Sequence, residues 1–105
     1  MPAPIECFMQ FDVRVTAEFS DWLAGLKDGR TQEAIAARLA RVQLGNFGDR
    51  KTEGDVVSAL RIHHGPGYRA YYTIRGGVVI FMLVGGTKRT QDRDIKRARQ
   101  IAKEL

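Results

Sequence analysis

The sequence predicts a single α+β domain built on a mainly antiparallel sheet. Three observations support this fold class. The 105 residues leave room for one hydrophobic core. Apolar residues make up 44% of the chain and charged residues 28%, which are proportions typical of a globular protein. The spacing of apolar residues changes along the chain between a strand period and a helix period. We therefore expect residues 1–105 to form one domain in the order strand, helix, helix, three strands, helix.

The N-terminal segment predicts a strand and a short helix. From Phe8 to Val15, apolar and polar residues alternate, as in a strand with one buried face. Thr16 can then cap a helix, and Glu18 lies in its first turn, where the helix dipole favours an acid. The apolar residues of this helix follow at spacings of three and four: Phe19, Trp22, Leu23 and Leu26. We expect the helix to end at residues 27–30, with Gly29 in a left-handed conformation.

A second helix is expected from Thr31, as its N-cap, to Gly45, where a glycine can end it. Its apolar stripe is formed by Ile35, Leu39 and Val42. Because few residues join the two helices, we expect them to pack together as an N-terminal helical hairpin against the sheet. Residues 45–51 contain many turn-forming residues and are expected to form a loop.

The second half predicts three strands and a final helix. The strands are expected at Val56–His63, Tyr68–Ile74 and Val78–Val84. The pair Gly76-Gly77 supplies the hairpin turn between the last two. The unbroken apolar run of residues 78–84 indicates a central strand that is covered on both faces. We expect Gly85-Gly86 to end that strand, and a helix to run from about Asp92 to Leu105.

Several classes of protein are excluded or disfavoured by the composition. No run approaches the roughly 18 apolar residues of a membrane span, and the first residues do not resemble a signal peptide. Cys7 is the one cysteine, so an internal disulfide and a cysteine-based metal cluster are both impossible. We expect a cytoplasmic protein with no metal and no cofactor.

The charge is distributed unevenly. Residues 1–55 contain 7 Lys/Arg and 9 Asp/Glu, a net charge of −2, whereas residues 56–105 contain 10 and 3, a net charge of +7. A solvated surface could carry such charge, but the clustering favours a face that binds a polyanion. Nucleic acid is the first candidate for this partner, and an acidic protein is the second.

The cations of the second half recur at strand ends and loops. In an antiparallel hairpin the start of one strand lies beside the end of the next, so Arg69 should lie close to Lys88 and Arg89. Arg61 lies in the preceding strand, and Lys51 could reach the same region. Tyr68 could stack on a base, or it could pack within the sheet. Cations beside an aromatic ring are typical of a site for single-stranded RNA.

The order of elements and the motifs together resemble the RelE/ParE superfamily of bacterial toxins. The motifs are Leu60-Arg61-Ile62, Gly67-Tyr68-Arg69-Ala70-Tyr71-Tyr72, and Gly85-Gly86-Thr87-Lys88-Arg89 through Ile95. Together with Leu44-Gly45-Asn46-Phe47-Gly48-Asp49, they are most similar to the HigB-like branch, whose members are called addiction module killer proteins or phage Gp49-like proteins. The resemblance covers about residues 11–102.

This resemblance implies the toxin of a type II toxin–antitoxin system that forms a hetero-oligomeric complex with its cognate antitoxin. RelE-type members enter the ribosome and cleave messenger RNA without a metal, because the RNA 2′-hydroxyl attacks the neighbouring phosphate. The resemblance places Arg69 as the cation that stabilises the phosphate and Arg89, beside Lys88, as the catalytic arginine. Arg61 and Lys51 match other basic positions of the family loosely.

One departure from the RelE pattern concerns proton transfer. RelE has a tyrosine shortly after its Lys-Arg pair, whereas this chain has Thr90-Gln91-Asp92-Arg93-Asp94. His63 and His64 could act as acid or base, although exposed residues at the edge of a loop are the favoured interpretation. Gln91 or Asp94 could position the substrate. Arg93 could contact RNA or belong to a solvated helix face.

Two other functions remain open from the sequence. A ParE-like toxin shares the fold but inhibits DNA gyrase, and the missing tyrosine favours it. The third reading is a non-catalytic module whose basic face binds RNA or an acidic antitoxin. The clustered cations near possible proton carriers favour the ribonuclease.

Overall fold

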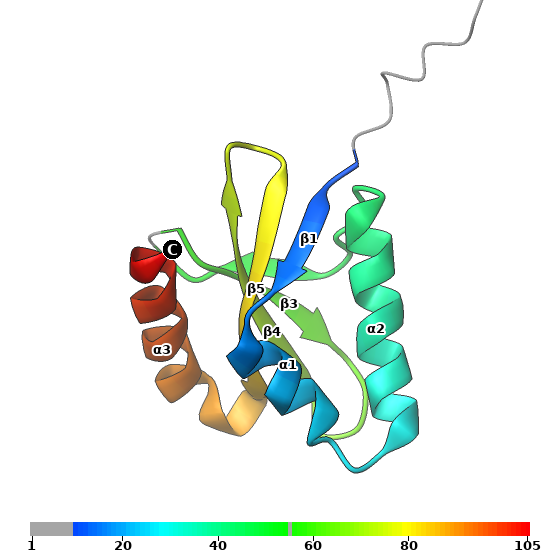
Figure 1. Ribbon diagram of the computed structural model, residues 1–105. Helices are drawn as coiled ribbons and strands as arrows, with labels where there is room; N and C mark the ends of the chain where they lie inside the picture. The colour runs from blue at the N-terminus through cyan, green and yellow to red at the C-terminus, as the bar shows by residue number, and fades with distance from the viewer. Residues whose placement is uncertain (1–9, 55) are drawn as a thin grey trace, which may run out of the picture.

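The computed structural model describes residues 10–54 and 56–105, in which a five-stranded sheet is packed between helices (Figure 1). The elements in chain order are β1 (Asp12–Val15), α1 (Ala17–Ala24), α2 (Gly29–Gln43), β2 (Arg50–Thr52), β3 (Ser58–Ile62), β4 (Tyr68–Arg75), β5 (Val79–Thr87), the 3₁₀ turn η2 (Lys88–Thr90) and α3 (Gln91–Glu104). The predicted α+β class is confirmed. Met9 and Cys7, together with the start of the predicted first strand, lie outside the described residues.

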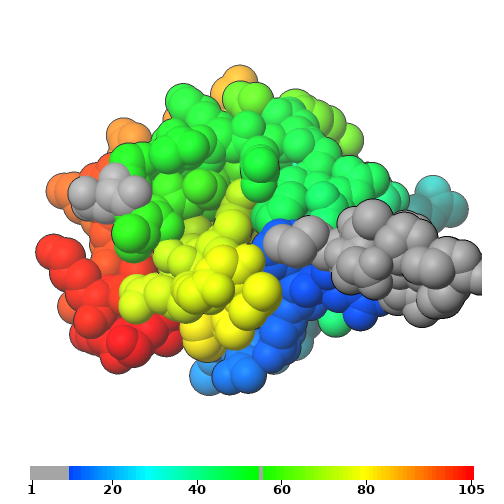
Figure 2. Space-filling view, turned by 90° about the horizontal axis from the view of Figure 1, so that it is seen from above, coloured from blue at the N-terminus to red at the C-terminus, as the bar shows by residue number. Residues whose placement is uncertain are grey.

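The sheet has the strand order β1-β5-β4-β3-β2. β2, β3, β4 and β5 pair antiparallel, whereas β1 pairs parallel with β5. The predicted glycine hairpin between β4 and β5 is confirmed, because Gly76 and Gly77 have φ of 61° and 77°. In the end-on view of Figure 2, this turn (yellow) lies between the C-terminal part of α3 (red) and β1 (blue).

Each face of the sheet buries its own core. On one face, Phe19 of α1 and Ile35 of α2 pack against Leu60, Tyr72 and Met82. On the other face, α3 covers a second cluster made of Val57, Ala59, Tyr71, Leu83, Val84, Ala98, Ile101 and Ala102. β5 is therefore an interior strand covered on both faces, as its apolar run predicts, although β4 has the central position. The register shifts between Tyr71 and Tyr72 of β4, where the β5 partners change from Val84 to Met82. This bulge leaves Leu83 as the extra residue of β5.

The helix boundaries correct two predictions. Thr16 caps α1 as expected, since its hydroxyl accepts a hydrogen bond from the Phe19 N–H at 3.0 Å. However, α1 already ends at Ala24. Asp28, not Thr31, is the N-cap of α2, because its carboxylate accepts from the Arg30 N–H at 3.0 Å. Gly29 is consequently the first residue of α2 and is not left-handed.

The expected helical hairpin is also wrong in detail. α1 packs on β5, and α2 packs on β1 and β3, so each helix directs its apolar residues into the sheet. Where the helices are joined, the Gln32 amide of α2 donates hydrogen bonds to the carbonyls of Leu23 and Leu26. The sheet offers both helices a larger apolar surface than they offer each other, which explains the arrangement.

Two boundaries in the sheet differ from the prediction. Residues 50–52, expected as loop, form the edge strand β2. Gly85 and Gly86 do not end β5, which continues to Thr87. A Cβ atom at Gly85 would lie 2.2 Å from the ring of Trp22, and one at Gly86 would lie 1.8 Å from Oδ2 of Asp94. Both glycines are therefore explained by close packing rather than by a chain reversal.

Candidate active site

A row of polar residues crosses the sheet where α3 begins. Asp49 precedes β2, and its carbonyl accepts from the Arg61 N–H of β3 at 2.9 Å. Arg61 is paired with Arg69 of β4, and Arg69 is paired with Gly86 of β5. Because side chains alternate along strands, Arg61 and Arg69 share the face of Ala59 and Tyr71, which is the face that α3 covers. Lys51, opposite Ala59, lies on this face as well.

A shallow groove of about 370 Å³ lies at the end of this row. It is lined by His63, the Gly65-Pro66-Gly67 turn, Arg69 and Lys88. The turn and η2 are fastened together, since the Lys88 N–H donates to the Gly67 carbonyl at 3.2 Å. Gly65 and Gly67 have φ of 57° and 86°, a conformation that other residues rarely adopt. The structure therefore brings Arg69 and Lys88 together as the hairpin geometry predicts, and it places His63 in the same groove.

The groove has a surplus of positive charge. Within residues 10–54 and 56–105, no ion pair neutralises Arg69, Lys88 or Arg89. Other cations of the second half are engaged elsewhere: Arg97 pairs with Glu18 at 2.8 Å, and Arg75 donates to the Ala102 carbonyl near the end of α3. Arg69 and Lys88 thus remain available to a polyanion at the groove, with Arg89 next to them in the chain, whereas Lys96 and Lys103, unpaired among the described residues, are exposed on α3.

Arg61 and His63 both bind Asp49. The Arg61 guanidinium donates to Oδ1 through Nε at 3.0 Å and Nη2 at 2.6 Å. Nε2 of His63 lies 2.6 Å from Oδ2. The hydrogen bonds from His63 and Arg61 hold the pKa of the Asp49 carboxyl below its usual value. Asp49 was not predicted as a site residue. It lies 12 to 14 residues from Arg61 and His63 in the chain, and only the pairing of the strands brings them into contact.

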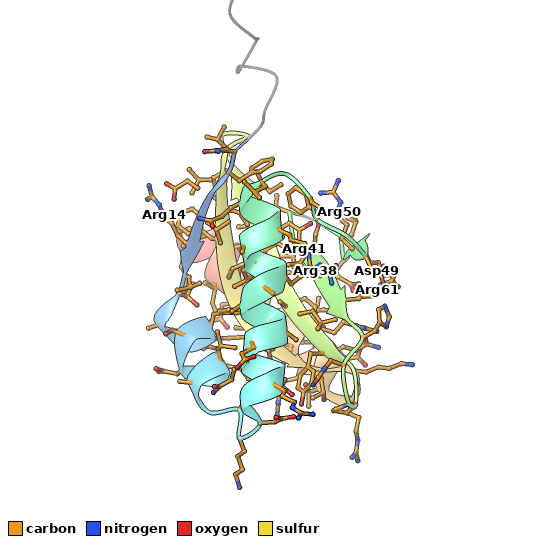
Figure 3. All side chains as sticks on the ribbon, turned by 90° about the vertical axis from the view of Figure 1, so that its right-hand side faces the viewer. Arg14, Arg38, Arg41, Asp49, Arg50 and Arg61 are labelled. Atoms are coloured by element: carbon orange, nitrogen blue, oxygen red, sulfur yellow. The ribbon has the colours of Figure 1, made fainter. Side chains whose placement is uncertain are left out.

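The loop that carries Asp49 is fixed by a buried arginine of α2. Arg38, which is 8% exposed, donates to three carbonyls: Phe47 at 3.0 Å, Asp49 at 2.6 Å and Arg61 at 2.8 Å. Figure 3 shows Arg38 extending from α2 toward Asp49 and Arg61. Gly48 leaves room for the guanidinium, since a Cβ there would lie 2.9 Å from Nε of Arg38. Burial lowers the pKa of Arg38. The sequence gives no sign of this role, because the burial of Arg38 follows from the fold.

His64 and Tyr68 lie away from the groove face. Nε2 of His64 is 3.9 Å from Oδ2 of Asp28, the N-cap of α2. Tyr68 packs edge-on against Trp22, with ring centroids 6.3 Å apart, on the face covered by α1 and α2. The structure therefore does not bring these two predicted site residues to Arg69.

The predicted residues after β5 occupy three different surroundings. Arg89, in η2, is exposed, and Gln91 begins α3. Asp94 is 7% exposed and accepts a hydrogen bond from the Thr90 hydroxyl at 2.6 Å, above Gly86. Arg93 lines a separate groove of about 400 Å³ with Glu18, Trp22 and Arg97. Of this group, Asp94 has a clear packing role.

The tyrosines near the site are not free to transfer protons. Tyr71 and Tyr72 are buried on opposite faces of the sheet. Burial raises the pKa of Tyr71 to about 12. Among the described residues, no group of three or more His, Cys, Asp or Glu side chains is arranged to hold a metal ion. The described part of the chain also contains no helix long and apolar enough to cross a membrane.

No protein-family model matches the sequence. The chain is 45% identical over 97 residues to an uncharacterized protein of Haemophilus influenzae, a match that covers 92% of this chain and 98% of that protein. The chain belongs to that protein's family. The fold is similar to the free state of a double arginine-to-alanine mutant of the E. coli toxin RelE, with a TM-score of 0.71 and 18% identity over 89% of this chain and 99% of RelE. This member of the Haemophilus protein's family therefore has a RelE-like fold.

Proposed function

We propose that the protein is the toxin of a type II toxin–antitoxin system, of the HigB-like branch, and that it cleaves messenger RNA on the ribosome. The observation that carries this proposal is the groove in which Arg69 and Lys88 lie beside His63 without a neutralising carboxylate of their own. The RelE-like fold supports it, since the toxin RelE provides the structural match.

The chemistry requires a negatively charged phosphate and two proton transfers. The 2′-oxygen of the RNA forms a bond to phosphorus, and the bond from phosphorus to the 5′-oxygen breaks. The products are a 2′,3′-cyclic phosphate and a 5′-hydroxyl. The 2′-hydroxyl proton passes to a base, and the 5′-oxygen gains a proton. Arg69, Lys88 and Arg89 supply charge that stabilises the phosphorane. His63 is the proton acceptor that the groove itself offers, and no metal or other cofactor takes part.

The proposal includes two partners in the bacterial cytoplasm. The ribosome presents the messenger RNA, and its own RNA attracts the remaining cations of Arg93 and Lys51. A cognate antitoxin with acidic residues would form a hetero-oligomer with the toxin and cover the groove. The acidic segment of the antitoxin would fold as it binds to the toxin.

Inhibition of DNA gyrase is the second candidate. One observation favours it: the described residues contain no tyrosine at the groove after Lys88 and Arg89, where RelE has one. A gyrase inhibitor would use the same cationic surface to bind protein, without cleaving RNA. Fold similarity does not separate the two activities.

The deciding experiment is brief induction of the protein in bacterial cells, followed by incorporation of labelled amino acids and labelled thymidine. The ribonuclease predicts a prompt loss of amino-acid incorporation and new cuts within translated transcripts. Arg69→Ala should abolish both effects. The matched control is Arg41→Ala, which removes an exposed arginine from α2. Intact protein synthesis with falling DNA synthesis would refute the ribonuclease and establish the gyrase reading.

A further inference from the structure

We infer that Asp49 is a positioning residue for catalysis: it holds the His63 ring at the groove so that one ring nitrogen is fixed as the proton acceptor. This inference rests on the proposed ribonuclease function and names a residue that the sequence does not single out. It stands on the contact of 2.6 Å between Nε2 of His63 and Oδ2 of Asp49 and on the position of His63 in the groove wall.

The contact decides which nitrogen of the ring is available. An ionised carboxylate only accepts hydrogen bonds, so the proton in this contact is on Nε2 of His63. In the neutral ring, Nδ1 then carries the free lone pair. Nδ1 has no hydrogen-bond partner among the described residues, and the His63 side chain is 73% exposed. The ring is thus tethered at one nitrogen and open to substrate at the other.

The carboxylate is itself held from two sides. Oδ1 of Asp49 accepts both hydrogen bonds from Arg61, which leaves Oδ2 for His63. The Asp49 carbonyl accepts from Arg38 and from the Arg61 N–H. Asp49 is therefore held both at its backbone carbonyl and at Oδ1. A residue fixed in this way can orient the His63 ring with little loss of entropy at the moment of reaction. This arrangement is typical of a carboxylate that orients a catalytic histidine.

The proposed step conserves protons. Nδ1 of His63 accepts the proton of the RNA 2′-hydroxyl as the 2′-oxygen bonds to phosphorus. The bond to the 5′-oxygen breaks, and that oxygen takes up one proton from water, while His63 returns its own to water. Asp49 stays ionised throughout and stabilises the imidazolium that forms. Arg69 and Lys88 face the same groove and stabilise the phosphate.

The charged groups around His63 come from each element that lies beside it. Asp49, from the loop before β2, contributes a negative charge in direct contact with the ring. Arg61 of β3, Arg69 of β4 and Lys88 of η2 contribute positive charges. Replacing the Asp49 carboxylate by an amide removes the group that only accepts hydrogen bonds, so the proton is no longer fixed on Nε2 of the ring. The ring ¹⁵N chemical shifts of His63, which report which nitrogen carries the proton, should therefore change in Asp49→Asn.

The test combines single-turnover cleavage of a messenger RNA on programmed ribosomes, with the full-length protein in excess, and the ¹⁵N spectrum of the His63 ring. We expect His63→Ala to slow cleavage about a hundredfold, and Asp49→Asn to slow it about tenfold. Because Asp49 acts through the ring, the double variant should be no slower than His63→Ala. The matched control is Asp12→Asn, which removes an exposed carboxylate paired with Arg14 at 2.8 Å and should leave the rate unchanged within twofold.

Each outcome has a defined meaning. A double variant that loses the product of the two single losses would overturn the inference, because Asp49 would then act independently of His63. An unchanged rate in His63→Ala, or ring ¹⁵N shifts of His63 that do not change in Asp49→Asn, would overturn it as well. The exposed His63 ring can be removed without unfolding the chain, so this arm does not depend on folding. Wild-type protein that leaves the messenger RNA intact would instead reject the proposed ribonuclease, and the inference with it.

Discussion

Replacing Arg38 by methionine should strongly destabilise the protein. The methionine covers the apolar path of the arginine stem, but it leaves the carbonyls of Phe47 and Arg61 without the Arg38 donor and the Asp49 carbonyl with the Arg61 N–H alone. Hydrogen bonds from a charged group contribute about 1.5–3 kcal/mol each. The desolvation of the buried guanidinium offsets part of that sum, so we expect Arg38→Met to lower the free energy of unfolding by about 3 kcal/mol. The free energy of unfolding of a domain of this size is about 5–15 kcal/mol in total.

The assay is urea denaturation followed through the fluorescence of Trp22, the one tryptophan of the chain. Arg41→Met is the matched control, because Arg41 lies one turn further along α2 and is exposed. We expect the control to change the free energy of unfolding by less than about 0.5 kcal/mol. In thermal unfolding, Arg38→Met should lower Tm by about 15 °C. A loss within 1 kcal/mol of the control would refute the idea that Arg38 holds the loop before β2.

Three further predictions concern other buried or charged groups. Tyr71→Phe should raise the free energy of unfolding by about 1 kcal/mol, since the buried hydroxyl has no hydrogen-bond partner in the described structure. The difference in stability between Tyr71→Phe and wild type should widen above pH 10. In wild type the Tyr71 phenol ionises there in the unfolded state, while in the folded state it keeps its proton to about pH 12. Gly86→Ala should cost about 2–3 kcal/mol through its clash with Asp94, whereas Gly29→Ala, with open space, should be neutral or stabilising in the same urea assay. Because folding lowers the pKa of Asp49, its ionised carboxylate stabilises the folded state above about pH 3.8, and this stabilisation is lost as the pH falls through the lowered pKa. The urea midpoints of wild type and Asp49→Asn should therefore converge in acid.

The regular elements could be predicted from the sequence because their signals are local. The threonine before α1 and the glycine pair of the β4–β5 hairpin have the same role in any fold, and the structure confirms both. Competing local signals explain the error at α2. Asp28 and Thr31 are both good N-cap residues three positions apart. The Thr31 side chain is buried, and its hydroxyl donates to the exposed Asp28 carboxylate.

Other features depend on partners that are distant in the sequence. Gly85 and Gly86 are typical of a strand end until Trp22 and Asp94 are placed against them. The groove residues Arg69 and Lys88 could be predicted because hairpin geometry brings them together. Asp49 could not, because its side-chain contacts come only when residues 49–52 add to the edge of the sheet. The roles of all these side chains in catalysis stay predictions.

The parallel pairing of β1 with β5 has a consequence for synthesis of the chain. Asp12 pairs with Val79, so β1 cannot pair with β5 until about three-quarters of the described chain has been synthesised. β4 also lacks one neighbour until β5 is present, and Lys88 and α3 follow later still. Contacts this far apart in sequence form late and slowly. We therefore expect a nascent chain to lack the groove until its last elements have emerged. Under the proposed function, the ribonuclease would therefore be inactive for as long as its own chain is being synthesised.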